Sequence, residues 1–544
     1  MFKSISNILL FLTTIEGLKE NPWTEKRANI LRDKMLYLWE NNVAFTLKFD
    51  HRYMGDYHDY MYDPKNTTTT KNCVDGVNEL CKAWYDEGNR LDDVGFTARK
   101  ALRLAFHDCI PYKDGSKGCD GCLNLNEDFE DNSGLQMTAA VLEKVFEDPD
   151  FPLGAPKLDL GPKDLGMSRA DLWAYSGLVA LAYYQKHSKK LCGDKLEAKK
   201  LMCDDPDPCF TSFPDVSKIF KVGRKDCANT DTKHLYRASK LEHHPNLGFN
   251  GQMLVDYFNG TFEFNPREVV ALMGAHTVGA FNGVNSKIDY GWVRSHKSKQ
   301  TEVFNNKYYK VLAARNAKCK EACIGNPMTV NGTAKARWDV NAKLFQKMFK
   351  ADFKDHSWDD PNASHPGHLY WHIRYQRMPL CGNVVKDDNA KEDETFFGKE
   401  KYQKCCAMKP EDMEQNQDCL RWVQDKIRHI STDVGLYLHW DIKDGIPSGC
   451  DIFKKKKLTT AEDFATKEYL GNAGCGKQMI KDDQGVPMHQ IVENYADNQQ
   501  EWLDDFFKTF AKMQQSVDNS DDLEQGPSSF WNITDDFACK IPPK

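Results

Sequence analysis

Apolar residues recur at helical spacing in several segments of the chain, and strict strand-like alternation is sparse. Helices are predicted over residues 25–47, 92–109, 135–146, 168–185, 265–276 and 486–515. The helix that starts at Ser168 is apolar on all sides, so it is expected to be buried, with serine as its N-cap. The helix after Asn265 has a typical start, with asparagine as the cap and proline at the first position. The predicted fold class is therefore mainly α.

The segments between these helices suggest how the chain is organised. Residues 187–245 and 313–425 have little periodicity and several cysteines, and they are expected to form disulfide-rich insertions. Residues 18–90 are interpreted as an N-terminal helical extension, 91–515 as the main domain, and 516–544 as a C-terminal tail. Residues 1–17 hold a lysine and a short apolar run, which is interpreted as a signal peptide. No other segment has about 18 consecutive apolar residues, so no membrane span is expected.

Composition narrows the compartment and the partners. The 544 residues carry a net charge of −7, which provides no field that would attract nucleic acid or an anionic membrane. The 18 cysteines are even in number and scattered, as in a disulfide framework formed outside the cytosol. A zinc site is the alternative for Cys119 and Cys122, but no histidine pair follows at finger spacing. We therefore expect a secreted protein. Candidate glycosylation sites begin at Asn66, Asn259, Asn331, Asn362 and Asn532.

Two apolar helices each contain a histidine with unusual neighbours. In RLAFHDC, Arg103, Phe106 and His107 lie three and four residues apart and share one helix face. An arginine beside a histidine on a buried face is costly unless a polar or anionic group binds there. In REVVALMGAHTVG, His276 follows Gly274 and Ala275, whose small size would let a flat, bulky group approach the backbone. A rim arginine and two packed core histidines remain the structural alternative.

The difference between the two histidines has a chemical interpretation. A haem iron needs one axial ligand, which is usually a histidine in peroxidases. On the other face, cleavage of a peroxide needs a base that moves a proton between its oxygens and a cation that stabilises the departing charge. His107 and Arg103 would supply the base and the cation, and His276 the ligand.

These segments resemble a known family. RLAFHDC is similar to the distal helix, and REVVALMGAHTVG to the proximal helix, of the plant, fungal and bacterial haem peroxidase superfamily. DNSGLQ, SRADLWAYSGLVAL, VFNNKYYKVLA, STDVGLYLHWD and the last predicted helix also resemble segments of that family. The resemblance implies a two-lobed helical fold with haem b between the distal and proximal helices. It also implies a disulfide from Cys109 to Cys119.

The resemblance assigns roles on both sides of the haem. On the distal side, His107 would be the acid–base group, and Arg103 would stabilise the ferryl oxygen and the leaving hydroxide. Phe106 would pack against the haem, and Asn132 would orient His107 and keep it basic.

On the proximal side, His276 would bind the iron, and Asp433 would accept its other ring proton. Thr277 and Trp292 are also expected beside the cofactor. The position of Trp292 resembles that of the proximal tryptophan of the intracellular class, which would let it hold a radical, although a core tryptophan is the alternative.

Secreted members of the family bind calcium beside the distal helix. The matching positions here are the side chains of Asp108 and Asp120, with backbone oxygens from Pro111 and Gly118. The usual serine ligand is replaced by Cys122, a poor ligand for a hard cation. Calcium and two loop-capping aspartates therefore remain alternative interpretations.

The sequence thus predicts a secreted haem peroxidase that reduces hydrogen peroxide through a ferryl intermediate and oxidises a small donor, by default aromatic or phenolic. Lys100 and Phe96 replace the glutamates of the fungal manganese site, so that site is not expected. The alternative function is a haem-binding or inactive homologue with a structural or recognition role. A zinc hydrolase built on His107 is the third candidate and lacks a further ligand at suitable spacing. The sequence does not indicate an oligomeric state.

Overall fold

A computed structural model of the chain describes residues 21–41, 96–125, 130–132, 134–152, 154–193, 214, 219–228, 236–246, 249–280, 292–293, 302–313, 324–328, 370–373, 377–379, 420–422, 428–443, 446–449 and 475–529. The predicted signal peptide, most of both predicted insertions, and four of the glycosylation candidates, at residues 66, 331, 362 and 532, lie outside these residues. Among the described residues, no helix is long and apolar enough to cross a bilayer.

Helices make up most of the described structure, as predicted. The α-helices are α1 (Glu25–Asn41), α5 (Ala98–Asp108), α6 (Gln136–Glu147), α7 (Arg169–Gly193), α9 (Gly251–Phe262), α10 (Pro266–Met273), α12 (Lys307–Leu312), α17 (Ser431–Gly435), α19 (Met488–Asp497) and α20 (Gln499–Gln514). Short 3₁₀ helices are η4 (Glu130–Asn132), η6 (Gly274–Thr277) and η10 (Ser520–Asp522).

The described strands are short and pair antiparallel. They are β1 (Lys221–Val222), β2 (Ile324–Met328), β3 (Tyr370–Ile373), β4 (Arg377–Pro379), β5 (Leu420–Trp422), β6 (Arg428–Ile430), β7 (Leu438–His439), β8 (Asp441–Lys443), β9 (Ile446–Ser448), β10 (Gly476–Lys477) and β11 (Glu524–Gln525). One sheet has the order β2-β3-β6, and the pairs β1-β11, β7-β10, β4-β5 and β8-β9 form the others. Strand β6 leads directly into α17 and so positions the start of that helix.

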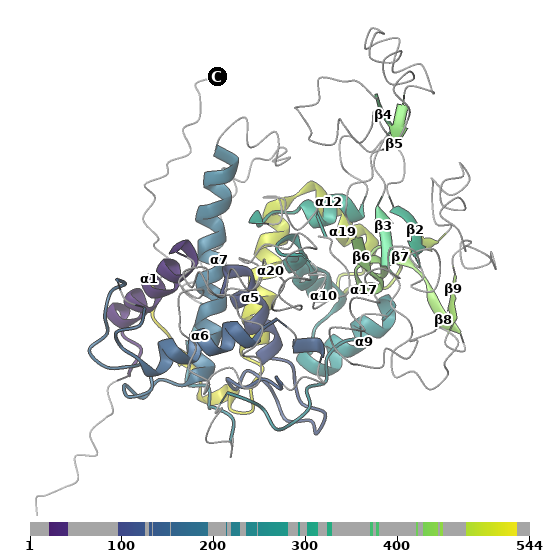
Figure 1. Ribbon diagram of the computed structural model, residues 1–544. Helices are drawn as coiled ribbons and strands as arrows, with labels where there is room; N and C mark the ends of the chain where they lie inside the picture. The colour runs from purple at the N-terminus through teal and green to yellow at the C-terminus, as the bar shows by residue number, and fades with distance from the viewer. Residues whose placement is uncertain are drawn as a thin grey trace, which may run out of the picture.

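The helices form two groups on either side of α20 (Figure 1). Helices α1, α5, α6 and α7 form one group, while α9, α10, α12, α17 and α19 form the other; α20 packs against both α5 and α10. Helix α5 lies close against α7. A Cβ added at Gly177 of α7 would lie only 2.5 Å from the Ala105 Cβ of α5. Glycine at this position is what allows the close approach.

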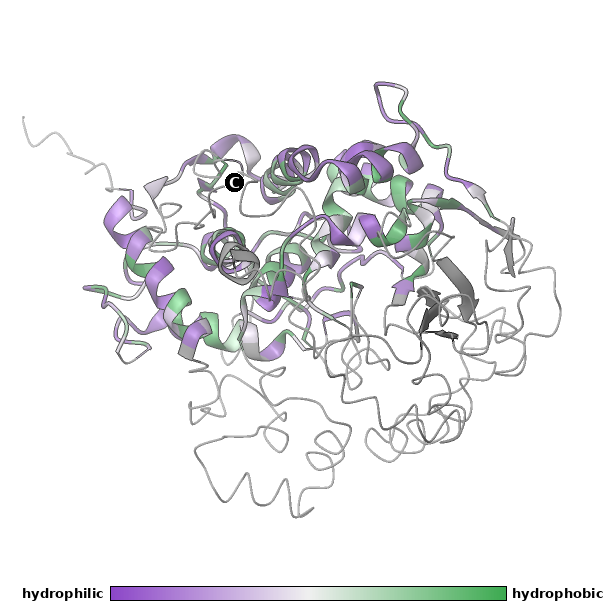
Figure 2. Cartoon of the chain, turned by 90° about the horizontal axis from the view of Figure 1, so that it is seen from above, coloured by the Kyte–Doolittle hydropathy of each residue, from purple (hydrophilic) through white to green (hydrophobic). Residues whose placement is uncertain are grey.

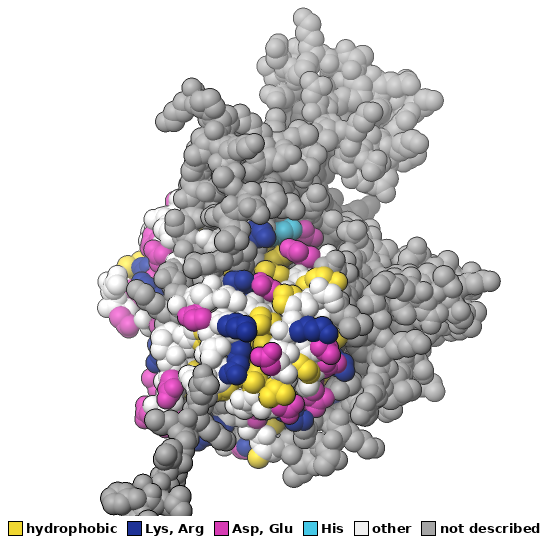
Figure 3. Space-filling view, turned by 90° about the vertical axis from the view of Figure 1, so that its left-hand side faces the viewer, with side chains coloured by type: hydrophobic (Ala, Val, Ile, Leu, Met, Phe, Trp, Pro, Cys, Tyr) yellow, Lys and Arg dark blue, Asp and Glu magenta, His cyan; other side chains and the backbone are white. Residues whose placement is uncertain are grey.

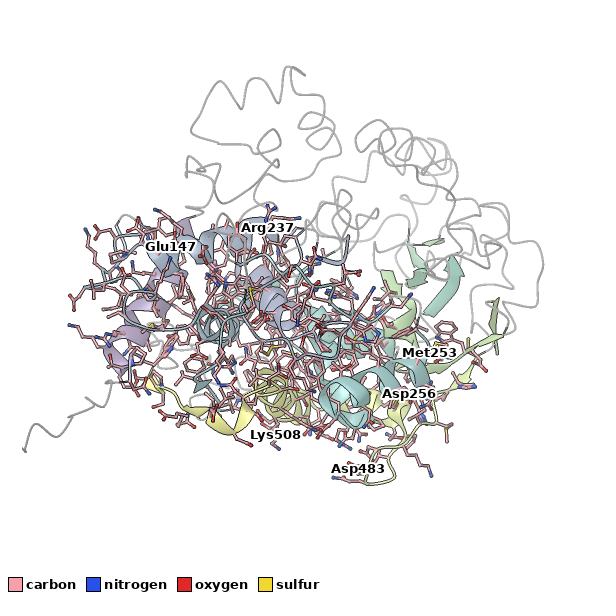
Figure 4. All side chains as sticks on the ribbon, turned by 90° about the horizontal axis from the view of Figure 1, so that it is seen from below. Glu147, Arg237, Met253, Asp256, Asp483 and Lys508 are labelled. Atoms are coloured by element: carbon pink, nitrogen blue, oxygen red, sulfur yellow. A yellow bond between two sulfur atoms is a disulfide. The ribbon has the colours of Figure 1, made fainter. Side chains whose placement is uncertain are left out.

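Most of the described helices are amphipathic, with hydrophilic and hydrophobic residues in separate stripes (Figure 2). Helix α7 is the exception, because it is buried on all sides from Arg169 to Ala182, as predicted. Helix α9 illustrates the pattern. Met253 and Asp256 lie on its exposed side (Figure 4), whereas Leu254 and Phe258 are buried in the main core. The amphipathic helices therefore contribute one apolar side each to a shared core that also contains α7.

Several predicted helix bounds are wrong, and local capping explains the differences. The helix predicted over 92–109 begins at Ala98 because Thr97 is an extended N-cap. The helix predicted over 486–515 is two helices, because Asn498 leaves the helical region and caps the second one. The predicted helix over 168–185 continues to Gly193, and that over 25–47 is described only to Asn41.

The first predicted insertion and the predicted C-terminal tail both contact other parts of the described structure. Strand β1, from the first predicted insertion, pairs with β11 of the predicted tail. In the tail, the Ser528 and Ser529 amides donate to Glu25 of α1. The Cys122–Cys227 disulfide also ties the first insertion to the loop after α5. These contacts join the first predicted insertion, the predicted tail and α1 to one another and to the loop after α5.

A buried ion pair between α7 and the segment after β1 supports a first prediction. Arg224 donates to Asp171 Oδ1 of α7 at 2.9 Å and to the Gln514 carbonyl oxygen at the end of α20 at 2.7 Å. Its side chain is 0% exposed. Arg224→Leu would leave the Asp171 carboxylate buried without its charge partner, which should lower the free energy of unfolding by about 3–5 kcal/mol in urea titrations.

The matched control is Lys225→Ala. Lys225 forms an ion pair with Asp522 at 3.7 Å, and its side chain is 74% exposed. Its loss should change the free energy of unfolding by less than about 0.5 kcal/mol. Equal effects of the two substitutions would contradict the role given to Arg224.

Candidate active site

The distal side of the site is built on α5. This helix starts where the Thr97 hydroxyl accepts a hydrogen bond from the Lys100 amide at 3.4 Å. Arg103, Phe106 and His107 follow on the helix, as predicted. His107 is 9% exposed, while Arg103 and Phe106 are half-buried. Arg103 Nε donates to His107 Nε2 over 3.2 Å, so the structure brings the predicted cation and base into direct contact.

The Asn132 amide determines which nitrogen of His107 carries a proton. Asn132 Oδ1 lies 2.8 Å from His107 Nδ1, and Asn132 Nδ2 donates to the Asn124 carbonyl oxygen at 2.8 Å. Because Nδ2 is the donor, Oδ1 accepts, so the proton is on His107 Nδ1 and the lone pair on Nε2. Burial, and then the charge on Arg103, hold the pKa of His107 well below its ordinary value. His107 is therefore a neutral base.

Two further distal residues escaped the sequence analysis. Glu242 is 1% exposed, and its Oε1 accepts hydrogen bonds from Asn132 Nδ2 at 3.2 Å and from the Asn124 amide at 2.5 Å. The His244 ring centre lies 4.9 Å from that of His107, and burial lowers the pKa of His244 to about 3.

A signal for these two residues exists in the sequence. Alternate residues of an extended segment point to the same side, so Glu242 and His244 both face the distal helix. His243 between them is exposed and packs against Tyr257 instead. The alternation at residues 242–244 is hard to recognise in the sequence, because residues 187–245 have little other periodicity.

The proximal side is centred on His276 in η6, which continues directly from α10. Helix α10 begins with a full capping box between Asn265 and Glu268, as its sequence indicates. His276 Nδ1 lies 2.8 Å from Asp433 Oδ1, so the predicted pair is in contact. Burial would raise the pKa of the Asp433 carboxyl, but the charge and hydrogen bond of His276 hold it below its ordinary value. His276 Nδ1 is thereby engaged, and Nε2 is the nitrogen available to a metal.

Trp292 stacks on the His276 ring, and Thr277 is the next residue of η6. The Trp292 and His276 rings stack with centres 4.2 Å apart, and Trp292 Nε1 donates to Asp433 Oδ2 at 2.9 Å. Thr277 is fully buried, and its hydroxyl donates to Asn305 Oδ1 at 3.4 Å. Trp292 and Thr277 thus help to hold the segment that carries the histidine.

The small size of Gly274 has another role than the predicted one of letting a flat group approach the backbone. A Cβ at Gly274 would come within 2.3 Å of Trp502 Nε1 and 2.4 Å of the Tyr309 hydroxyl. Gly274 is needed for packing against α20 and α12, and not for the approach of a flat ligand. Ala275, which is half-buried, is the small residue left on the ligand side.

The residues present fit a haem. Arg103, Phe106, Ala275, His276 and Trp292 are partly exposed, although the apolar residues around them on α5 and α10 are buried. The segment after η6 approaches α5, where a Cβ at Gly279 would lie 3.9 Å from Arg99 Cδ. This set offers an aromatic surface, an imidazole oriented by a carboxylate, and a base with a cation. These are the groups that haem iron and a peroxide require.

The residues expected to bind calcium have other partners. Asp108 Oδ1 accepts from the Gly121 amide at 2.8 Å, and both Asp120 oxygens accept from the Tyr112 hydroxyl at 3.0 and 3.1 Å. The Pro111 carbonyl oxygen accepts from the His243 amide at 2.8 Å.

The cysteines around this loop are disulfide-bonded, including the predicted pair Cys109–Cys119. They are therefore not zinc ligands. Among the described residues, no group of three or more His, Cys, Asp or Glu side chains is placed to hold a metal ion.

Comparisons with known proteins agree with this geometry. A family model described as "Peroxidase" matches residues 77–352. An Aspergillus fumigatus protein named "Putative heme-binding peroxidase" is 28% identical over 251 residues, which cover 45% of this chain and 59% of that protein. A Mycosarcoma maydis protein of the same name is 25% identical over 225 residues, 40% of this chain and 52% of that protein.

A Yarrowia lipolytica protein, also of that name, is 23% identical over 257 residues, 46% of this chain and 68% of that protein. The chain thus spans little more than half the length of the first two relatives. The family match covers half of the chain and includes both histidine-bearing helices. The chain therefore belongs to the peroxidase family of the plant, fungal and bacterial type.

Proposed function

We propose that this protein is a haem-dependent peroxidase that reduces hydrogen peroxide and oxidises small donors, aromatic or phenolic by default. The observation that carries the proposal is the contact of Arg103 with His107 on one helix, together with the His276–Asp433 pair on another. A protein that only binds haem has no need for a cation in contact with a neutral base. This difference favours an enzyme over a structural or recognition homologue.

The distal residues would move one proton. His107 Nε2 would take a proton from one peroxide oxygen and return it to the other, which would leave as water, with the two electrons supplied by the haem. Arg103 would stabilise the negative charge that develops on that leaving oxygen. Asn132 keeps the Nδ1 proton of His107 in place, so that Nε2 stays the basic atom. The neutral state of His107 in the structure supports this role.

The proximal residues would hold the cofactor. His276 Nε2 is the proposed axial ligand of the iron in haem b, and Asp433 makes the imidazole more electron-rich by accepting its Nδ1 proton. When bound, haem would supply the electrons that reduce the peroxide, and the donor would later return electrons to the haem. Trp292, stacked on His276, is the proposed residue for holding an unpaired electron or passing one inward.

We also propose that the protein is exported and carries glycans. Two disulfides among the described residues support an oxidising compartment. Asn259, the one glycosylation candidate within the described residues, is exposed near the end of α9. Acidic and basic side chains are interspersed on the face shown in Figure 3, which supports partners other than nucleic acid.

Substitution of the distal histidine tests the proposed function. His107→Leu should leave haem uptake intact and should slow the reaction with hydrogen peroxide by a factor of about 10²–10⁴, because the base is removed. The measurement is stopped-flow absorbance of the haem-loaded protein. His243→Ala, which changes an exposed histidine nearby, is the control and should react at the parent rate. A His107→Leu variant as fast as the parent would remove the assignment.

The calcium expectation is the one that the site supports least. Calcium takes about six to eight oxygen ligands, whereas the expected set offers two carboxylates and two carbonyls, most of which already accept hydrogen bonds. Burial raises the pKa of both the Asp108 and the Asp120 carboxyl.

We therefore expect the protein to be indifferent to calcium. Dialysis against a calcium chelator should leave both the Soret band and the thermal unfolding midpoint unchanged. A fall in the midpoint that added calcium reverses, and that Asp120→Asn abolishes, would show that the carboxylates bind the ion after all.

A further inference from the structure

The buried carboxylate of Asp433 accepts hydrogen bonds from three other donors in addition to the proximal histidine. Asp433 is 0% exposed. Its Oδ2 accepts from Trp292 Nε1 at 2.9 Å and from the Ile430 amide at 2.9 Å. Its Oδ1 accepts from His276 Nδ1 at 2.8 Å and also from the Tyr308 hydroxyl at 2.7 Å. Two strong donors therefore share one carboxylate oxygen.

Tyr308 is held in this arrangement by its surroundings. It lies on α12, is 0% exposed, and meets the His276 ring edge-on with ring centres 5.9 Å apart. Burial and the nearby charge of Asp433 raise the pKa of Tyr308 well above its ordinary value, so the hydroxyl keeps its proton. Its hydroxyl is thus a permanent donor to Asp433, and not an alternative base.

When two donors share one acceptor oxygen, each hydrogen bond to that oxygen is weaker than it would be alone. The electron density that Asp433 Oδ1 gives to the Tyr308 hydroxyl is not available to the Nδ1 proton of His276. A weaker bond to that proton makes the imidazole less like an imidazolate, and hence a weaker donor to a metal at Nε2.

We propose that Tyr308 is a positioning residue that limits the pull of Asp433 on His276 and so tunes the electron density that the axial ligand gives to the haem iron. The inference rests on the proposed function, because it requires His276 to be the ligand. A phenylalanine in this place would leave the His276–Asp433 pair intact and remove the competition.

The helix supplies a matched control for the test. Tyr309 is the next residue, is equally buried, and donates its hydroxyl to the Val270 carbonyl oxygen at 2.6 Å instead of to Asp433. Tyr308→Phe and Tyr309→Phe each delete one buried hydroxyl from the same turn of α12. Only the first should affect the axial ligand.

The experiment compares three haem-loaded proteins, the parent and the two variants. The readouts are the iron–histidine stretching frequency of the ferrous form by resonance Raman spectroscopy and the ferric/ferrous equilibrium by redox titration. Tyr308→Phe should raise the stretching frequency and shift the equilibrium toward the ferric form by about threefold or more. Tyr309→Phe should leave both at the parent values. Equal shifts in the two variants, or none in Tyr308→Phe, would overturn the proposal.

Two further measurements distinguish a failure of this proposal from a misfolded variant and from a failure of the proposed function. In an Asp433→Asn background, Tyr308→Phe should cause no further shift, because the shared acceptor is changed. Difluorotyrosine at position 308, a stronger donor, should shift both readouts in the opposite direction; a shift in the same direction would contradict the mechanism. A parent protein without an iron–histidine band would contradict the proposed function itself, whereas a parent band that Tyr308→Phe leaves unmoved would contradict only the role of Tyr308.

Discussion

The hydrogen bonds around the Asp433 carboxylate hold the proximal half of this protein together. Through His276, Trp292 and Tyr308, one buried side chain connects its own segment to residues 125 to 157 positions earlier in the sequence. The Ile430 amide, three residues before Asp433, donates to it from within the same segment. A buried carboxylate is tolerated only where such donors surround it. The same bonds that stabilise the charge also orient the imidazole, so stability and ligand geometry depend on one group. Asp433 lies outside the part of the chain that matches the family model, yet it completes the site of that part.

The distal half follows the opposite electrostatic design. There the charge is a cation, Arg103, and the histidine beside it is kept neutral by burial and by that charge. His107 receives its orientation from Asn132, which is itself fixed by Asn124 and Glu242. One imidazole is thus made electron-rich by an acid, and the other is kept free of a proton at Nε2. Two histidines of the same type are thereby suited to different tasks, one to bind a metal and the other to move a proton.

Local patterns were sufficient to predict the helices and the paired histidines. Apolar periodicity and caps predicted the helix that leads to His276. The spacing of Arg103 and His107 predicted that they share one helix face. The positions of Asn132 and Asp433 came from the family resemblance, and the structure brings both against their histidines. What could not be predicted depends on contacts between distant segments. Glu242 and His244 reach the distal site from a stretch without periodicity, and Gly274 packs against Trp502 and Tyr309, which lie elsewhere in the sequence. The break at Asn498 is a local signal that a continuous amphipathic pattern concealed.

The central claim is that the two histidines face one haem and perform different chemistry on it. The most direct measurement is the absorption spectrum of the haem-loaded parent protein before and within milliseconds after one equivalent of hydrogen peroxide. The account predicts a Soret band that shifts and loses intensity, because a haem held by His276 would react with peroxide with His107 acting as the base. A protein that takes up no haem, or a haem spectrum that ignores peroxide, would contradict it.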